Sequence, residues 1–131
     1  MIPLFSYGAL QDIGVQEQFL GRTVDGTPDH LPGFVLTVAE LDDTDLIAAT
    51  GSARHPMAVL GTSSGTRVRG TVYLLTEAEL DAVDRHSGVG FHRVPVELGS
   101  GITAWAYVDR RYRPPLLSRG AVPAESQELA A

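Results

Sequence analysis

The pattern of apolar and polar residues predicts a series of short strands with two helices among them. An apolar run over residues 2–7, ended by Gly8, is typical of a buried strand. Alternation over 69–75 and from 93 to 108 predicts three more, the last two joined by a turn at Gly99-Ser100-Gly101. Further strands are expected at 23–27, 34–39 and 46–49.

Two segments carry the spacing and the end signals of helices. Between Asp12 and Leu20, the residues Ile13, Gln16, Phe19 and Leu20 recur at roughly helical spacing. Asp12 is a possible N-cap, and Gly21 is expected to end the helix. Thr76 and Glu79 have the form of a capping box, and the helix that they begin should end near Ser87-Gly88.

The remaining chain is expected to be loop and tail. Residues 50–65 are rich in Gly, Ser and Thr and predict a long surface loop around a short apolar island at 57–60. Residues 113–131 are rich in Pro, Ala, Ser and Glu, which predicts an extended or partly disordered tail after a single domain at 1–112. The fold class expected is α+β, with a small mixed, mostly antiparallel, barrel-like sheet and flanking helices.

Composition narrows the classes of partner and site. The net charge is −6 with scattered basic residues, so no nucleic acid partner is expected. No apolar run is long enough for a membrane span, and the N-terminus lacks the features of a signal peptide, so a cytoplasmic location is expected. The chain has no cysteine, and its histidines lack metal-ligand spacing, so no metal and no cofactor are expected.

Three segments, in unbroken order, resemble one known family. They are LFSYGALQ at 4–11, LPGF at 31–34, and the stretch 68–108 with VRGTVY, LDAVD, GFHRVPV and AWAYV. Together they are similar to the signatures of the gamma-glutamylcyclotransferase-like (AIG2-like) family, over roughly residues 2–109. The resemblance implies a small mixed sheet beside helices.

The resemblance also implies a reaction and a site. Enzymes of this family cyclise a gamma-glutamyl group, releasing an amine or amino acid and 5-oxoproline. The loop after the Tyr-Gly signature binds anionic groups through backbone N–H, which here assigns substrate contacts to Tyr7, Gly8, Ala9 and Leu10. Tyr107 is expected to line the same pocket, and the ligand is expected to be a small molecule.

The chain departs from the family at the catalytic position. A glutamate at the end of the later helix is the family's general base, and the alignment places Ser87 there, with His86 in place of an aromatic residue. A serine cannot act as a base without its own activator. A shifted alignment would place Asp84 at the base position instead.

Three interpretations stay open from the sequence. The protein keeps the pocket and binds a small carboxylate or amine; or it catalyses another reaction, with His86 as base or acid and Ser87 as a hydrogen-bond donor; or Asp84 restores cyclotransferase activity.

Each candidate also has a structural explanation. His86 could face the negative end of a helix dipole, Ser87 could be a plain helix terminus, and Asp84 could pair with Arg93. His55 and His92 are interpreted as structural or exposed. The sequence leaves a homodimer open.

Overall fold

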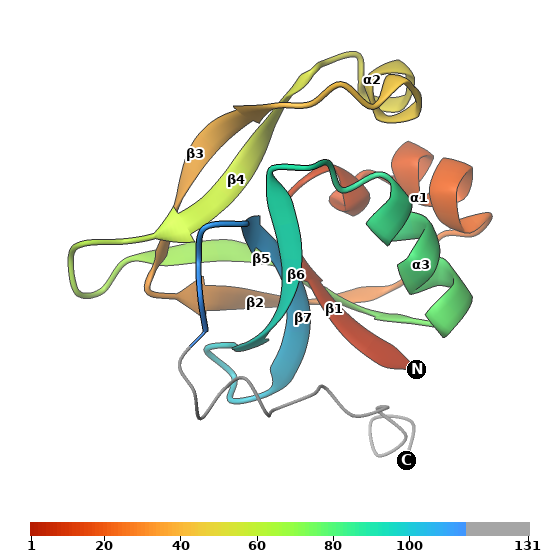
Figure 1. The fold of residues 1–131 in the computed structure, drawn as a ribbon. Helices are drawn as coiled ribbons and strands as arrows, with labels where there is room; N and C mark the ends of the chain where they lie inside the picture. The colour runs from red at the N-terminus through yellow and green to blue at the C-terminus, as the bar shows by residue number, and fades with distance from the viewer. Residues whose placement is uncertain (115–131) are drawn as a thin grey trace.

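The computed structural model describes residues 1–114 of the 131-residue chain (Figure 1). The sequence-based expectation of a tail over 113–131 therefore falls almost wholly outside the described residues. In chain order the elements are β1 Ile2–Ser6, the 3-10 helix η1 Ala9–Gln11, α1 Ile13–Leu20, β2 Gly26–Pro32, β3 Phe34–Glu40, α2 Thr44–Thr50, β4 Arg54–Leu60, β5 Arg67–Leu75, α3 Glu77–Arg85, β6 Phe91–Glu97 and β7 Thr103–Asp109.

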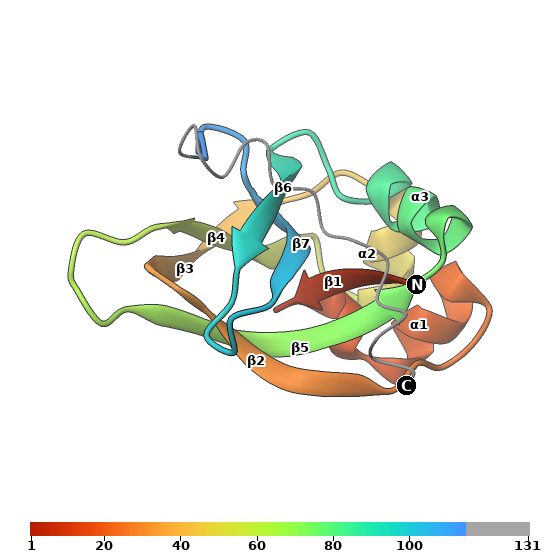
Figure 2. The ribbon, with the colours of Figure 1, turned by 90° about the horizontal axis from the view of Figure 1, so that it is seen from below.

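The strands form a five-stranded sheet and a separate two-stranded ribbon. The sheet has the order β2-β5-β1-β7-β6, and only the β1–β7 pair is parallel. The ribbon of β3 and β4 extends away from the sheet, and the helices gather on the other side of the molecule (Figures 1 and 2). The expected α+β class and mostly antiparallel pairing are confirmed, although the strands among residues 1–114 do not close into a barrel.

β1 lies in the centre of the sheet and supplies both hydrophobic clusters. Because successive side chains of a strand point to opposite faces, Leu4 packs toward α1 and α3 while Phe5 packs toward β4 and β6. Both side chains are only 1% exposed. The Tyr7–Leu10 turn begins at the end of this strand, so the turn is held by a buried central strand of the sheet.

Several local signals are confirmed at the helix ends. The Asp12 side chain accepts from the Val15 N–H, and Gly21 ends α1 in the left-handed conformation, at φ 76°. The Thr76–Glu79 capping box is present at the start of α3. The hairpin at 99–101 is closed by a 2.9 Å hydrogen bond from Leu98 N to Ile102 O.

The region from 23 to 60 differs from the sequence prediction. The strand expected at 23–27 begins later, at β2, and the strand expected at 46–49 is wrong, because those residues belong to helix α2. Asp43 caps that helix by accepting from the Leu46 N–H at 2.8 Å. The loop expected at 50–65 is wrong over Arg54–Leu60, which is β4. β4 is strand because each of its residues pairs with one of β3, and no local pattern encodes that pairing.

None of the helices among residues 1–114 has the length and apolar character needed to cross a membrane.

Gly70 marks the closest approach of β5 to β1. A Cβ added at Gly70 would lie 2.4 Å from the Ser6 carbonyl oxygen and 2.7 Å from Cζ of Phe5. We expect Gly70→Ala to lower the free energy of unfolding by about 2 kcal/mol, because strand backbone and a core ring must both shift. Urea unfolding measures this, and an unchanged midpoint would show that β1 moves aside freely.

Candidate functional site

A cavity of about 120 Å³ lies between the end of β1, the helices and the start of β4. Most of its wall is apolar. All three α-helices and η1 contribute apolar side chains to it, which are Leu10, Val15, Phe19, Leu46 and Val83. The polar residues that line it are fewer: Ser6, Tyr7, His55, His86, Ser87 and Tyr107. The predicted residues Tyr7, Gly8, Ala9, Leu10, His86, Ser87 and Tyr107 therefore all line one cavity, whereas Asp84 is not part of its lining.

The Gly8 turn, with Ala9 and Leu10 after it, forms one wall of this cavity. The Gly8 carbonyl accepts from Gln11 N at 3.1 Å, which turns the chain into η1. The N–H groups of Ala9 and Leu10 have no backbone acceptor among residues 1–114. A Cβ at Gly8 would lie 3.5 Å from Cγ of Pro56, an ordinary contact, so packing within the protein does not by itself require glycine. Free N–H groups at the start of a helical turn suit an anionic group.

The Tyr7 hydroxyl joins three separate segments below the cavity. It donates to the Tyr107 carbonyl at 2.6 Å and accepts from the Ala58 N–H at 2.9 Å. Burial raises the Tyr7 pKa to about 12, so the hydroxyl keeps its proton at neutral pH. Both of its hydrogen-bonding roles are thus filled by the protein, and Tyr7 positions β4 and β7 around the cavity.

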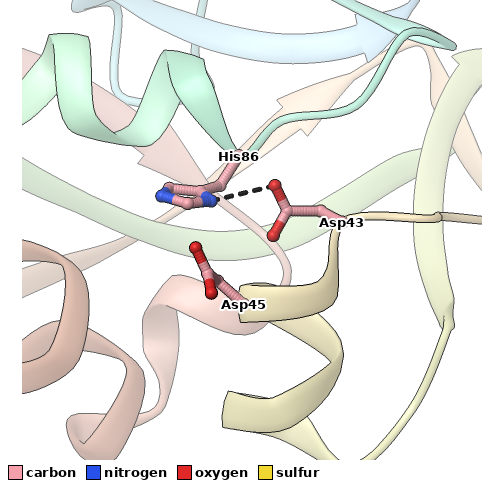
Figure 3. A group of neighbouring side chains, drawn as sticks. All are labelled: Asp43, Asp45 and His86. Atoms are coloured by element: carbon pink, nitrogen blue, oxygen red, sulfur yellow. Dashed lines mark hydrogen bonds and ion pairs between the residues drawn. The ribbon is translucent and has the colours of Figure 1, made fainter.

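His86 ends helix α3 and is held on two sides. Its Nδ1 lies 2.9 Å from Oδ2 of Asp43 (Figure 3). Its ring also stacks on Phe19, with 4.4 Å between the centroids. The pKa of Asp43 lies below its ordinary value, first because the Leu46 N–H donates to it and then through His86. A carboxylate beside Nδ1 favours the tautomer with the proton on Nδ1, which leaves Nε2 as the basic nitrogen.

Ser87 and Asp84 make contacts that belong to the fold. The Ser87 hydroxyl donates to the Asp84 carbonyl at 3.0 Å, as a residue at a helix end commonly does. The Asp84 carboxylate pairs with Nε of Arg93 at 3.0 Å, as the sequence suggested, and also accepts from the Tyr107 hydroxyl. Burial and this carboxylate raise the pKa of Tyr107. Arg93 in turn lies over the ring of Trp105, 4.4 Å from its centroid.

Sequence reasoning missed two residues of the site, Asp43 and His55. Asp43 followed by Thr44 and Asp45 has the form of a helix start, and that signal could have revealed both α2 and the carboxylate. His55 is buried, and its Nε2 lies 2.8 Å from the Ser52 carbonyl oxygen. This hydrogen bond agrees with the structural role expected for His55.

One group among residues 1–114 has the donor set for a divalent cation. Asp43, Asp45 and His86 each offer a ligand atom within 4.8 Å of the others (Figure 3). Neither spacing nor composition predicted it, because the residues come from two distant segments. Asp45 is exposed, and the His86–Asp43 contact has the length of a hydrogen bond, so we interpret the group as a His–Asp pair.

Comparisons with known proteins agree with this fold. Three solved structures share the fold: the Arabidopsis thaliana proteins At3g28950.1 and At5g39720.1, each 24% identical with TM-scores of 0.61 and 0.62, and PH0828 from Pyrococcus horikoshii, 16% identical with a TM-score of 0.58. The alignment with At3g28950.1 covers 98% of this chain and 73% of that chain, and the alignment with At5g39720.1 covers 98% and 81%. The alignment with PH0828 covers 96% of this chain and 87% of that chain. No curated protein matches the chain.

The family comparison covers most of the sequence. The family model described as gamma-glutamyl cyclotransferase, AIG2-like matches residues 4–126, which include most of β1, the Gly8 turn, α3 and the β6–β7 hairpin. The resemblance seen in the sequence is thereby confirmed. The chain belongs to the gamma-glutamyl cyclotransferase, AIG2-like family.

Proposed function

We propose that the cavity binds a small molecule with an amine and a carboxylate, in the first instance a gamma-glutamyl amide, and that His86 replaces the family glutamate as general base. One observation carries the proposal: the His86 ring lines the cavity while its Nδ1 is 2.9 Å from a carboxylate of Asp43. A base whose far nitrogen is oriented by a third group is the usual arrangement for activating a nucleophile.

The Gly8 turn supplies the complementary half of the site. The N–H groups of Ala9 and Leu10 have no backbone acceptor within residues 1–114 and can hold the α-carboxylate of the ligand. A carboxylate held there places the adjacent α-amine inside the cavity, on which His86 also borders.

The proton then moves in two steps. Nε2 of His86 takes a proton from the α-ammonium, and the free amine attacks the γ-carbonyl carbon to form a five-membered ring. The imidazolium returns the proton to the leaving nitrogen as the amide C–N bond breaks, and the ring nitrogen, which still carries two protons after the attack, loses one of them to water. The products are 5-oxoproline and the free amine. Asp43 stays ionised, because its pKa is lowered, and stabilises the imidazolium between the steps.

A second candidate function is binding without turnover. It is favoured by the mostly apolar wall and by the Ser87 hydroxyl, which is already bonded to the Asp84 carbonyl at 3.0 Å. In this alternative the His86–Asp43 pair only closes one side of the cavity.

Substitutions at Ser87 test the proposal against this alternative. With a panel of gamma-glutamyl amines and dipeptides, we expect wild type to release 5-oxoproline and Ser87→Ala to keep kcat/KM within about threefold, since its hydroxyl bonds the protein itself. Turnover by Ser87→Glu alone would assign the natural protein to binding. A lack of turnover in wild type and Ser87→Glu alike would contradict gamma-glutamyl chemistry in this cavity.

A further inference from the structure

A second, open depression lies at the end of the β6–β7 hairpin nearest α3. It is lined by Val89, Phe91, His92, Arg110 and Arg113, with a volume of about 400 Å³. The hairpin pairs His92 with Val108 and so places 89–92 beside 110–113, and a 2.9 Å hydrogen bond from Arg110 N to Gly90 O fixes this contact. Phe91 lines both this depression and the first cavity.

Three of the five lining residues are basic, and none is acidic, although the protein carries a net charge of −6. Each guanidinium is held through one nitrogen by backbone oxygens: Nη1 of Arg110 by Val89 at 3.1 Å, and Nη1 of Arg113 by the Arg110 carbonyl at 2.6 Å. The nearby carboxylate of Asp109 is occupied by Arg111, whose Nη2 lies 2.7 Å away. The two lining arginines are therefore oriented, and no carboxylate pairs with them among residues 1–114.

His92 adds an unsatisfied buried nitrogen to this group. Its Nε2 is buried and has no hydrogen-bond partner within the described part of the chain. Burial lowers the pKa of His92, and Arg113 and Arg110 add to that effect, while the Tyr112 backbone and Asp109 oppose it. An unpaired buried polar atom costs stability, and the two arginines that line the depression with His92 favour an anion beside it.

We propose that this depression is a binding site for a small oxyanion, a phosphate or phosphate monoester, held between Arg110 and Arg113 beside His92. Guanidinium groups suit this chemistry because their planar N–H donors match phosphate oxygens in pairs. Val89, which is 82% exposed, and Phe91 offer an apolar surface to the organic part of an ester. The site is separate from the proposed cyclisation and does not depend on it.

Nuclear magnetic resonance of the four histidine side chains tests the site. The full chain is titrated at constant ionic strength with inorganic phosphate, and separately with phenyl phosphate. We expect saturable shifts of the His92 ring signals, a rise of its pKa when the anion is bound, and affinity about tenfold lower in the double variant Arg110→Gln/Arg113→Gln. The double variant Arg67→Gln/Arg69→Gln changes two exposed arginines on β5 that do not line the depression. It removes the same charge and should change affinity less than twofold.

The probes and a milder variant separate the outcomes. Tighter binding of phenyl phosphate assigns the site to an ester, and equal binding assigns it to free phosphate. Arg110→Lys keeps the positive charge but lacks the paired N–H donors of a guanidinium group. This variant should bind phosphate about threefold more weakly than wild type, and it tests the site even if Arg110→Gln/Arg113→Gln fails to fold. Shifts that rise linearly without saturation, or equally in all four histidines, would overturn the proposal.

Discussion

His86→Gln is expected to lower kcat for 5-oxoproline release by about 10²–10⁴-fold, the usual contribution of a positioned general base. Glutamine keeps a polar group near Asp43, whose Oδ2 lies 2.9 Å from Nδ1 of His86, but it cannot take a proton from an ammonium group. Single-turnover kinetics measure the loss, and an unchanged melting temperature excludes unfolding as its cause. A variant with wild-type kcat would remove His86 from the reaction.

The Asp43→Asn variant is the matched control for orientation. Asparagine is as good an N-cap as aspartate, so the hydrogen bond that begins α2 at Leu46 is kept while the charge is removed. We expect kcat to fall by about tenfold or more, because the imidazolium that forms during the reaction loses its neighbouring carboxylate. A purely structural role for Asp43 would leave kcat within about twofold of wild type.

Tyr7→Phe is expected to lower the free energy of unfolding by about 2–4 kcal/mol. The change leaves the Ala58 N–H and the Tyr107 carbonyl without their partner, at distances now of 2.9 and 2.6 Å from the hydroxyl. Each buried group that loses its hydrogen bond costs about 1–3 kcal/mol. Because both groups support the cavity, ligand affinity should fall together with stability, as chemical denaturation and a binding titration would measure.

Tyr112→Phe provides the comparison for this change. The Tyr112 ring packs edge-on against Phe34, with centroids 5.0 Å apart, and burial raises the pKa of its hydroxyl. No hydrogen bond from that hydroxyl is present within residues 1–114, so its removal should change stability by less than about 0.5 kcal/mol. Equal losses in the two variants would show that the Tyr7 bridge contributes nothing of its own.

The parts of the fold predicted from sequence are those set by local chemistry. β1 was visible as an apolar run ended by Gly8, and α3 as a capping box at Thr76 followed by a periodic face. The three ordered segments also indicated the family. Through that resemblance they predicted that Tyr7 and Tyr107 line one pocket, and both residues line the cavity. Such signals need only a few neighbouring residues, and tertiary contacts reinforced them here.

The parts that the sequence left out depend on contacts between distant segments. The segment Leu46–Ala49 is so short and so apolar that its periodicity fits a strand and a helix equally well. The N-cap at Asp43 favours the helix that the structure shows. Arg54–Leu60 reads locally as loop and becomes a strand only through its ladder with Phe34–Glu40.

The same division applies to the chemistry. From its resemblance to the family, the sequence alone predicted that Ser87 stands where the family has glutamate, with His86 before it. It could not reveal that His86 meets Asp43, 43 residues earlier, or that His92 lies beside Arg110 and Arg113. Only the tertiary structure decided these pairings. Side chains far apart in the sequence are brought together by the packing of α2 and α3 against α1 and by the register of β6 on β7, which no local pattern specifies.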